Sequence, residues 1–176
     1  RKFRYNHKNL HSYSEDEDEM TYYSYEEFVV DTKKLVLLCQ EFQADTLLAI
    51  ARGGLTLGHA YAHAVDNRRL FAIHSILYEK DAKGQSGEIF NTPELKDAKK
   101  VLILDDIIDS GQTIKEVLAL LKQCFPDIEF KIASLFYKPT AVIQPDFAVR
   151  EATDWIEFFW EKDFIVDTSA SQTAKG

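Results

Sequence analysis

The stretch from Val101 to Thr113 constrains the fold of this chain more than any other. Its first four residues are apolar, which indicates a strand buried on both faces, as in a parallel sheet. Two carboxylates, Asp105 and Asp106, are predicted to end the strand, and a short polar loop follows. Beyond the loop, apolar residues recur at helical spacing, at Ile114, Val117, Leu118 and Leu121. The stretch therefore predicts a strand, a turn and a helix, with a ligand site at the carboxyl end of the strand.

The composition of the loop favours an anion as the ligand. The loop supplies an acid, two hydroxyls, a glycine and an amide, in the order Asp109, Ser110, Gly111, Gln112 and Thr113. The helix start adds free backbone N–H groups and the positive end of its dipole, which suit a phosphate. The acidic pair suits sugar hydroxyls, a hard cation such as Mg²⁺, or both. The alternative is an ordinary turn whose aspartates cap the helix. The fingerprints of P-loop and dinucleotide-binding proteins are absent from the sequence.

Strands alternate with helices along the chain, which predicts one α/β domain with a mainly parallel central sheet flanked by helices. A capping-box pattern at Ser24 and Glu27 starts the first helix. The predicted elements after it are a strand at 46–50, a loop at 51–57, a helix at 58–65, a strand at 70–78, a long polar loop at 79–100 and a strand at 130–137. We expect an acidic N-terminal extension at 1–19, the domain at 20–166 and a polar tail at 167–176.

Composition limits the function classes open to the chain. The 176 residues carry a net charge of −8 and are 45% hydrophobic, which fits one domain with a real core and argues against nucleic-acid binding. No apolar run approaches the roughly 20 residues of a membrane span. Cys39 and Cys124 are expected to be buried in helices, not to form a disulfide or a metal site. A reducing, cytoplasmic setting follows.

The stretch at 101–113 resembles the signature of the type I phosphoribosyltransferases, which bind 5-phosphoribosyl 1-pyrophosphate (PRPP). That signature is an apolar run, two acidic residues, two apolar residues and Asp-Thr-Gly-x-Thr, and Ser110 here replaces the first Thr. The resemblance covers about 20–166 and is closest to the short bacterial and archaeal xanthine-guanine-hypoxanthine enzymes. It implies that 109–113 bind the 5-phosphate, that Asp105 and Asp106 bind the ribose and Mg²⁺ (Asp106 as a metal ligand), and that a small hood from both ends of the chain covers the base.

Two further segments resemble parts of the same family. Arg52, Gly53 and Gly54 resemble its pyrophosphate-binding loop, in which glycines permit close approach or positive φ. Tyr78 falls where the family has a mobile loop with a Ser-Tyr pair, although Leu77 stands where Ser is usual. Closure of the loop at 79–92 would exclude water.

The expected base site lies toward the C-terminus. The resemblance implies that Lys138 donates to the 6-oxo group of a purine, that Trp155 stacks on the base and that the backbone near Ile156 reads its edge. Asp109 is the candidate to accept or relay a proton from the base. Trp160 is expected to pack in the core instead.

The resulting prediction is a purine-salvage phosphoribosyltransferase that acts on guanine, xanthine or hypoxanthine, with PRPP and Mg²⁺, as a homodimer or homotetramer. Lys138 disfavours adenine, and Trp155 disfavours orotate. The alternative from another class is a regulatory protein that binds PRPP or nucleotide with little or no catalysis. His59 and His63 have the spacing of paired metal ligands, but a solvated or helix-capping role is favoured.

Overall fold

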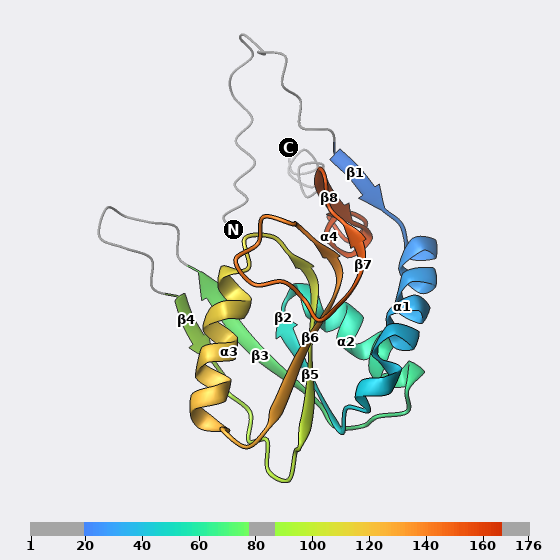
Figure 1. Cartoon of the computed structure of the whole chain (residues 1–176). Coiled ribbons are helices and arrows are strands. Elements are labelled where there is room, and N and C mark those ends of the chain that lie inside the picture. Colours follow the sequence, from blue (N-terminus) through green and yellow to red (C-terminus); the bar gives the residue numbers. More distant parts are fainter. Residues whose placement is uncertain (1–19, 78–86, 167–176) are drawn as a thin grey trace, which may run out of the picture.

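The computed structural model describes residues 20–77 and 87–166 (Figure 1). Within these ranges, six strands form one sheet in the order β4-β3-β2-β5-β6-β7. All neighbours are parallel except β3 and β4. The strands are β2 (Thr46–Ala51), β3 (Leu70–Leu77), β4 (Gly87–Phe90), β5 (Lys100–Ile108), β6 (Glu129–Tyr137) and β7 (Phe147–Glu151).

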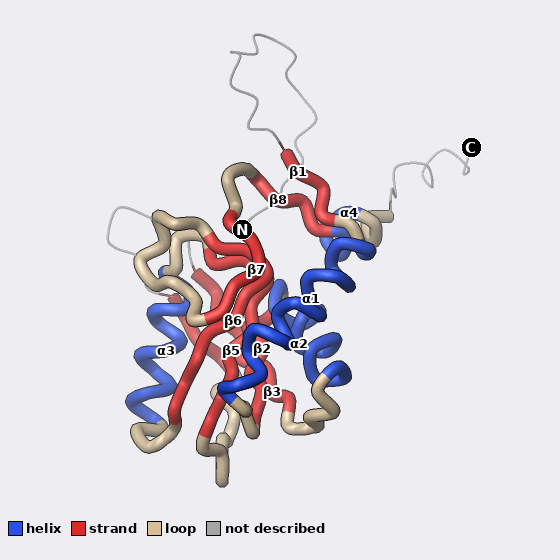
Figure 2. Tube along the Cα trace, turned by 45° about the vertical axis from the view of Figure 1, so that its right-hand side comes forward, coloured by secondary structure: helices blue, strands red, loops and turns tan. Residues whose placement is uncertain are grey.

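Helices cover both faces of this sheet (Figure 2). Helices α1 (Tyr25–Cys39) and α2 (Gly53–Ala64) pack on the face to which Leu102 and Leu104 of β5 point. Helix α3 (Gln112–Cys124) packs on the other face, against Val101 and Ile103. Successive residues of one strand thus enter two different cores, which confirms that the apolar run of β5 is buried on both faces.

A second, smaller sheet lies above the end of the main sheet where β5 and β6 finish (Figure 2). It consists of β1 (Met20–Tyr23) and β8 (Trp155–Phe158), which pair in parallel, with Met20 opposite Trp155 and Tyr23 opposite Phe158. The short helix α4 (Phe159–Lys162) follows β8. We call β1 and β8 the hood. Both ends of the described chain contribute to it, as the family resemblance implies.

Aromatic rings attach the hood to the main sheet. The Tyr23 ring lies edge-on to Phe136 of β6, with 4.9 Å between centroids, and Phe158 stacks on Trp160 at 4.6 Å. Tyr23 and Phe158 are 1% and 0% exposed, and Trp160 packs against the same core. Trp160 was expected to be a core residue of an edge strand; it packs against the core but lies in α4 and is only partly buried.

Several predicted boundaries were wrong. Helix α2 begins at Gly53, five residues before the predicted start, because its packing against the sheet outweighs the poor helix propensity of paired glycines. The polar segment at 79–100 contains the edge strand β4, and β1 was not predicted, since both are short and lack clear alternation. Cys39 is buried as expected, and burial raises the pKa of its thiol to about 11, whereas Cys124, the last residue of α3, is exposed.

None of the helices in the described part of the chain is long and apolar enough to span a membrane. The predicted segments 1–19 and 167–176 lie outside the described residues.

Candidate active site

A pocket forms where β5 passes into α3. It is lined by the end of the strand and the loop, through Asp105, Ile107, Ile108, Asp109, Ser110, Gly111, Thr113 and Ile114. The strand runs on to Ile108, so Asp105 and Asp106 lie within β5 and do not end it as predicted. Gly111 precedes the helix with a φ of 74°, a conformation that glycine adopts without strain. The loop thus brings hydroxyls and backbone amides to the start of α3, as an anion site requires.

The segment after β6 supports this loop from behind. The amide of Val142 donates to the Ser110 carbonyl at 2.9 Å, and the amide of Lys138 donates to the Ile108 carbonyl at the same distance. A side chain at Gly111 would place its Cβ 2.9 Å from the amide nitrogen of Ile143, so only glycine leaves room there. The two segments therefore pack as one unit, which fixes Lys138 relative to the loop.

An ion pair joins the two segments at the surface. Nζ of Lys138 lies 2.8 Å from Oδ1 of Asp109, with the side chains 33% and 54% exposed. The side-chain amide of Gln144 donates to three carbonyls of the turn that follows Lys138, those of residues 138, 139 and 141. The turn holds the lysine at the edge of the sheet, in reach of Asp109.

A second pocket opens on the other side of this ion pair. It is lined by Ile107, Asp109, Lys138, Asp154, Trp155, Ile156 and Phe158. Ile107 and Asp109 line both pockets, so the two cavities are neighbours that share one carboxylate. The structure thus brings together the residues assigned from the sequence to the base site.

The hood covers this second pocket with alternating residues of β8. Ile156 and Phe158 are 7% and 0% exposed and belong to the core, while Trp155 is 37% exposed at the rim. This alternation follows from the two-residue period of a strand. Trp155 is therefore placed at the mouth of the pocket, where an incoming flat ligand can meet the indole.

The start of α2 approaches the acidic pair from the opposite face of the sheet. A Cβ on Gly53 would lie 2.2 Å from Oδ2 of Asp106, and one on Gly54 would lie 2.4 Å from the carbonyl oxygen of Leu104. Neither glycine has a positive φ, so these positions are glycine because of space and not because of backbone conformation. Arg52, preceded by a cis peptide bond, is exposed beside them.

Comparison with known proteins agrees with this geometry. Residues 32–163 match the phosphoribosyl transferase domain family, which is more than half of the chain. The chain belongs to this family. A solved Helicobacter pylori xanthine-guanine-hypoxanthine phosphoribosyltransferase is 36% identical with a TM-score of 0.78, and the match covers 82% of this chain and 96% of that one.

Two sequence relatives match over shorter stretches. A xanthine-guanine phosphoribosyltransferase of Ruegeria is 27% identical over 65% of this chain and 67% of its own. The mouse hypoxanthine-guanine phosphoribosyltransferase is 36% identical over 44% of this chain and 40% of its own length. The predicted fold class, a mainly parallel α/β sheet of the type I phosphoribosyltransferases, is confirmed.

The acidic pair of this phosphoribosyltransferase divides its two side chains between the faces of the sheet. Asp105 lines the pocket beside α3, while Asp106, 6% exposed, faces Gly53 at the start of α2. Backbone amides donate to both: that of residue 106 to Oδ1 of Asp105 at 3.0 Å and that of residue 107 to Oδ1 of Asp106 at 2.7 Å. The pair therefore bridges the 109–113 loop and the α2 start.

This donor set fits Mg²⁺ that keeps water and substrate oxygens as ligands. Carboxylates are hard oxygen donors, and the Asp106 carboxylate lies directly against the start of α2, where a Cβ on Gly53 would clash with it. In residues 20–77 and 87–166, no cluster of three or more acidic, histidine or cysteine side chains could hold a metal by itself. The ring centroids of His59 and His63 lie 4.8 Å apart. Among the described residues, no third side chain joins them to form a metal site.

Some residues of the phosphoribosyltransferase site were missed or lie outside the structure. Tyr78 lies outside the described residues; Leu77 ends β3, opposite Gly87. Gln112 does not line the pocket; its side chain donates to Glu116 at 2.7 Å. Asp154 lines the second pocket and was not assigned from the sequence, although its place directly before Trp155 could have indicated it.

Proposed function

We propose that this phosphoribosyltransferase transfers the 5-phosphoribosyl group of PRPP to a 6-oxopurine and releases pyrophosphate. One observation carries the proposal: two neighbouring pockets share Asp109, one built for an anion and the other containing Lys138 and Trp155. A transfer between two substrates requires such adjacency, because both must meet at one carbon atom. The names of the relatives from Helicobacter, Ruegeria and mouse support a 6-oxopurine as the acceptor.

PRPP would lie across the carboxyl edge of the sheet. Its 5-phosphate would bind the amides and hydroxyls of 109–113, and its pyrophosphate would bind Arg52 with the amides of Gly53 and Gly54. The ribose between them would contact Asp105 and Asp106. The opposite directions of these two carboxylates support this assignment, since each faces one of the two phosphate sites.

Of these two carboxylates, Asp106, on the side of the proposed pyrophosphate site, would also hold Mg²⁺. Bound there, the ion would neutralise charge on the pyrophosphate as it leaves. The same carboxylates would stabilise positive charge that develops at the anomeric carbon.

The purine would enter the second pocket. Lys138 would donate to its 6-oxo group, Trp155 would stack on its face, and the backbone at Ile156 would read its edge. The base would displace Lys138 from Asp109, and this carboxylate would then accept the proton that the attacking ring nitrogen loses. Tyr78 and the segment after it would close over PRPP. We further propose a homodimer or homotetramer that works in the cytoplasm.

The test is an assay of nucleotide formation with PRPP and Mg²⁺ and, separately, guanine, xanthine, hypoxanthine, adenine and orotate. We expect product with at least one 6-oxopurine and none with adenine or orotate. Product with adenine alone would contradict the role given to Lys138. PRPP binding without any product would favour a regulatory PRPP-binding protein instead, and light scattering on the same sample tests the oligomeric state.

A further inference from the structure

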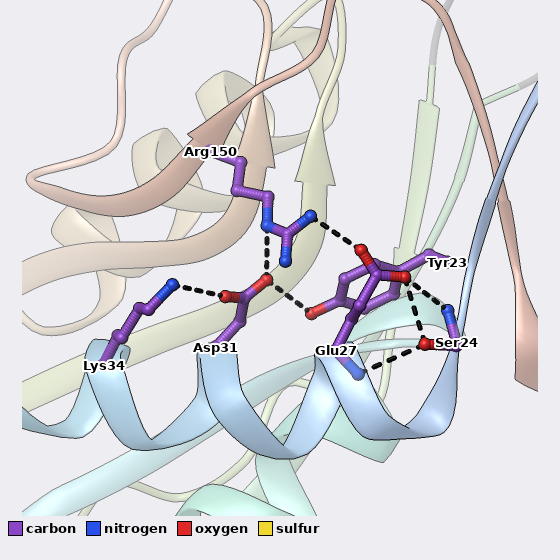
Figure 3. A network of polar contacts seen from close by, with 6 residues as sticks. All are labelled: Tyr23, Ser24, Glu27, Asp31, Lys34 and Arg150. Carbon is purple, nitrogen blue, oxygen red and sulfur yellow. Dashed lines mark hydrogen bonds and ion pairs between the residues drawn. The ribbon is translucent and has the colours of Figure 1, made fainter.

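A cluster of charged side chains lies outside both pockets, where β1, α1 and β7 meet (Figure 3). Its centre is Asp31, which is 0% exposed. The Asp31 carboxylate forms ion pairs with Nε of Arg150 at 2.6 Å and with Nζ of Lys34 at 3.2 Å. It also accepts a hydrogen bond from the Tyr23 hydroxyl at 3.1 Å. Nη1 of Arg150 also donates to Oε1 of Glu27 at 2.9 Å. The proposed reaction uses none of these residues.

The arginine also contacts the aromatic rings that attach the hood. Its guanidinium carbon lies 5.5 Å from the ring centre of Tyr23 and 5.9 Å from that of Phe136. Arg150 is paired in the sheet with Phe136, two residues before Lys138. One guanidinium thus connects helix α1, the hood and β6, the strand that directly precedes the lysine of the base pocket.

This cluster contacts both strands to which β8 is attached. On one side, β8 pairs with β1, whose last residue, Tyr23, donates to Asp31. On the other, β8 follows β7 after only three residues, and β7 carries Arg150. Trp155 and Ile156, which line the base pocket, are therefore supported by two strands that meet at a single buried carboxylate.

We propose that Arg150, held by Asp31 and Glu27, is a positioning residue that sets the hood over the base pocket and thereby sets the affinity for the purine. This inference rests on the proposed function. Apolar ring contacts alone allow small shifts between packed elements, whereas a guanidinium shared by two carboxylates fixes direction as well as distance. The backbone hydrogen bonds that support the phosphate loop run from Lys138 to Ile108 and from Val142 to Ser110, and none of these residues belongs to the cluster.

The experiment compares Arg150→Lys and Arg150→Met with the wild type. Lysine keeps the charge but cannot reach both carboxylates in a planar fork, and methionine keeps only the stem. We expect the KM for the purine to rise about tenfold in the lysine variant and further in the methionine variant, because small misplacement of a binding group is costly. The Kd for PRPP, measured by calorimetry, should stay within about twofold.

Arg69→Met is the matched control. Arg69 also anchors two segments, with Nε on the Thr46 hydroxyl at 3.0 Å and Nη2 on the Lys96 carbonyl at 2.8 Å, but it lies at the opposite end of the sheet. It should leave the KM for the purine unchanged. If Arg150→Met does not fold, Glu27→Gln removes the charge of one of the two carboxylates that hold Arg150, and a smaller rise in the same KM is expected.

Two results would overturn this inference and leave the proposed function standing. One is an equal rise in the KM for the purine and the Kd for PRPP; the other is an unchanged KM in variants whose melting temperature has fallen. A wild-type protein that forms no nucleotide from any base would overturn the proposed function, and with it this inference.

Discussion

Asp109 is the charged residue that lines both pockets, and its environment determines what it can do. The carboxylate is half exposed and forms an ion pair with Lys138, which lines the base pocket. An ion pair this exposed contributes little to stability, which means that a substrate can separate the two partners at low cost. The ion pair therefore contributes little to the fold, and both groups can be released to contact substrates.

Replacing Asp109 with Asn keeps the shape and removes the proton acceptor. We expect kcat to fall by about 10²- to 10⁴-fold, the usual contribution of a positioned acid or base. PRPP binding should persist, because the backbone amides of the loop remain. Calorimetry with PRPP and a steady-state assay measure the two effects, with Asp163→Asn, whose carboxylate accepts from the Tyr22 hydroxyl at the surface, as the control. Unchanged kcat would refute the proton-transfer role.

Asp154 gives the base pocket an excess of negative charge, since Lys138 is offset by Asp109. Its Oδ2 accepts from the Thr153 hydroxyl at 2.8 Å. A carboxylate there favours a purine that presents a donor, such as the 2-amino group of guanine, over one that presents the 2-oxo group of xanthine.

Asp154→Asn should therefore raise kcat/KM for xanthine relative to guanine by about tenfold, or about 1.4 kcal/mol in discrimination. Competition between the two bases for limiting PRPP measures this ratio directly. A ratio equal to that of the wild type would show that the Asp154 side chain does not read the base.

At the scale of elements, the start of α2 can lie close against β5 because Gly53 and Gly54 have no side chains. Gly53→Ala would force the buried carboxylate of Asp106 to move, since the new Cβ would lie 2.2 Å from it. We expect kcat/KM to fall at least tenfold, with a loss of about 1–3 kcal/mol in stability from overpacking. Leu55→Ala, at an exposed position in the same helical turn, is the control. Activity retained in Gly53→Ala would mean that Asp106 does not need its present position.

The elements that the sequence predicted well are those with a strong local signal. The apolar run of β5, the capping box at Ser24 and the spacing in α3 all depend on neighbours in the chain, and all three are confirmed. The hood strand β1 could not be recognised, because Met20–Tyr23 becomes a strand only by pairing with β8. Likewise, Asp31 lies on the helix face that meets Arg150, a contact between residues that no local pattern links.

The candidate site shows the same difference between features with a local sequence signal and features that depend on distant contacts. Asp109, Lys138 and Trp155 were assigned through motifs, and the structure brings them to one pocket. Gly53 and Gly54 were expected in a loop but begin a helix, since only the three-dimensional contact with β5 shows why no side chain fits. The shared border of the two pockets is also a property of the folded chain and not of any segment.

At the scale of the whole molecule, carboxylates far from the site link stability to pH. The Ser24 amide, together with Arg150, lowers the pKa of Glu27. Burial opposes the charge of Asp45, but hydrogen bonds from the Thr46 hydroxyl and the amides of Lys100 and Lys99 outweigh it and lower its pKa as well. Both groups bind protons more weakly in the folded than in the unfolded chain.

The free energy of unfolding should therefore be level near neutral pH and fall below about pH 4.5, as these carboxylates take up protons. The contribution of each is present above its unfolded pKa and is lost as the pH falls through its lower folded value. Urea unfolding from pH 7 to pH 3 measures the slope. Glu27→Gln and Asp45→Asn should each flatten it, and slopes equal to that of the wild type would contradict the assignment.

The pairing of β1 with β8 joins residues from opposite ends of the described chain, Met20 with Trp155. Contacts between residues so distant in sequence form late when a chain folds, because closing the largest loop costs the most entropy. The strand and loop at 101–113, by contrast, depend on contacts closer in sequence. We therefore expect the phosphate site to be assembled before the purine site, so that a newly made molecule acquires the means to hold the donor before it can accept a base.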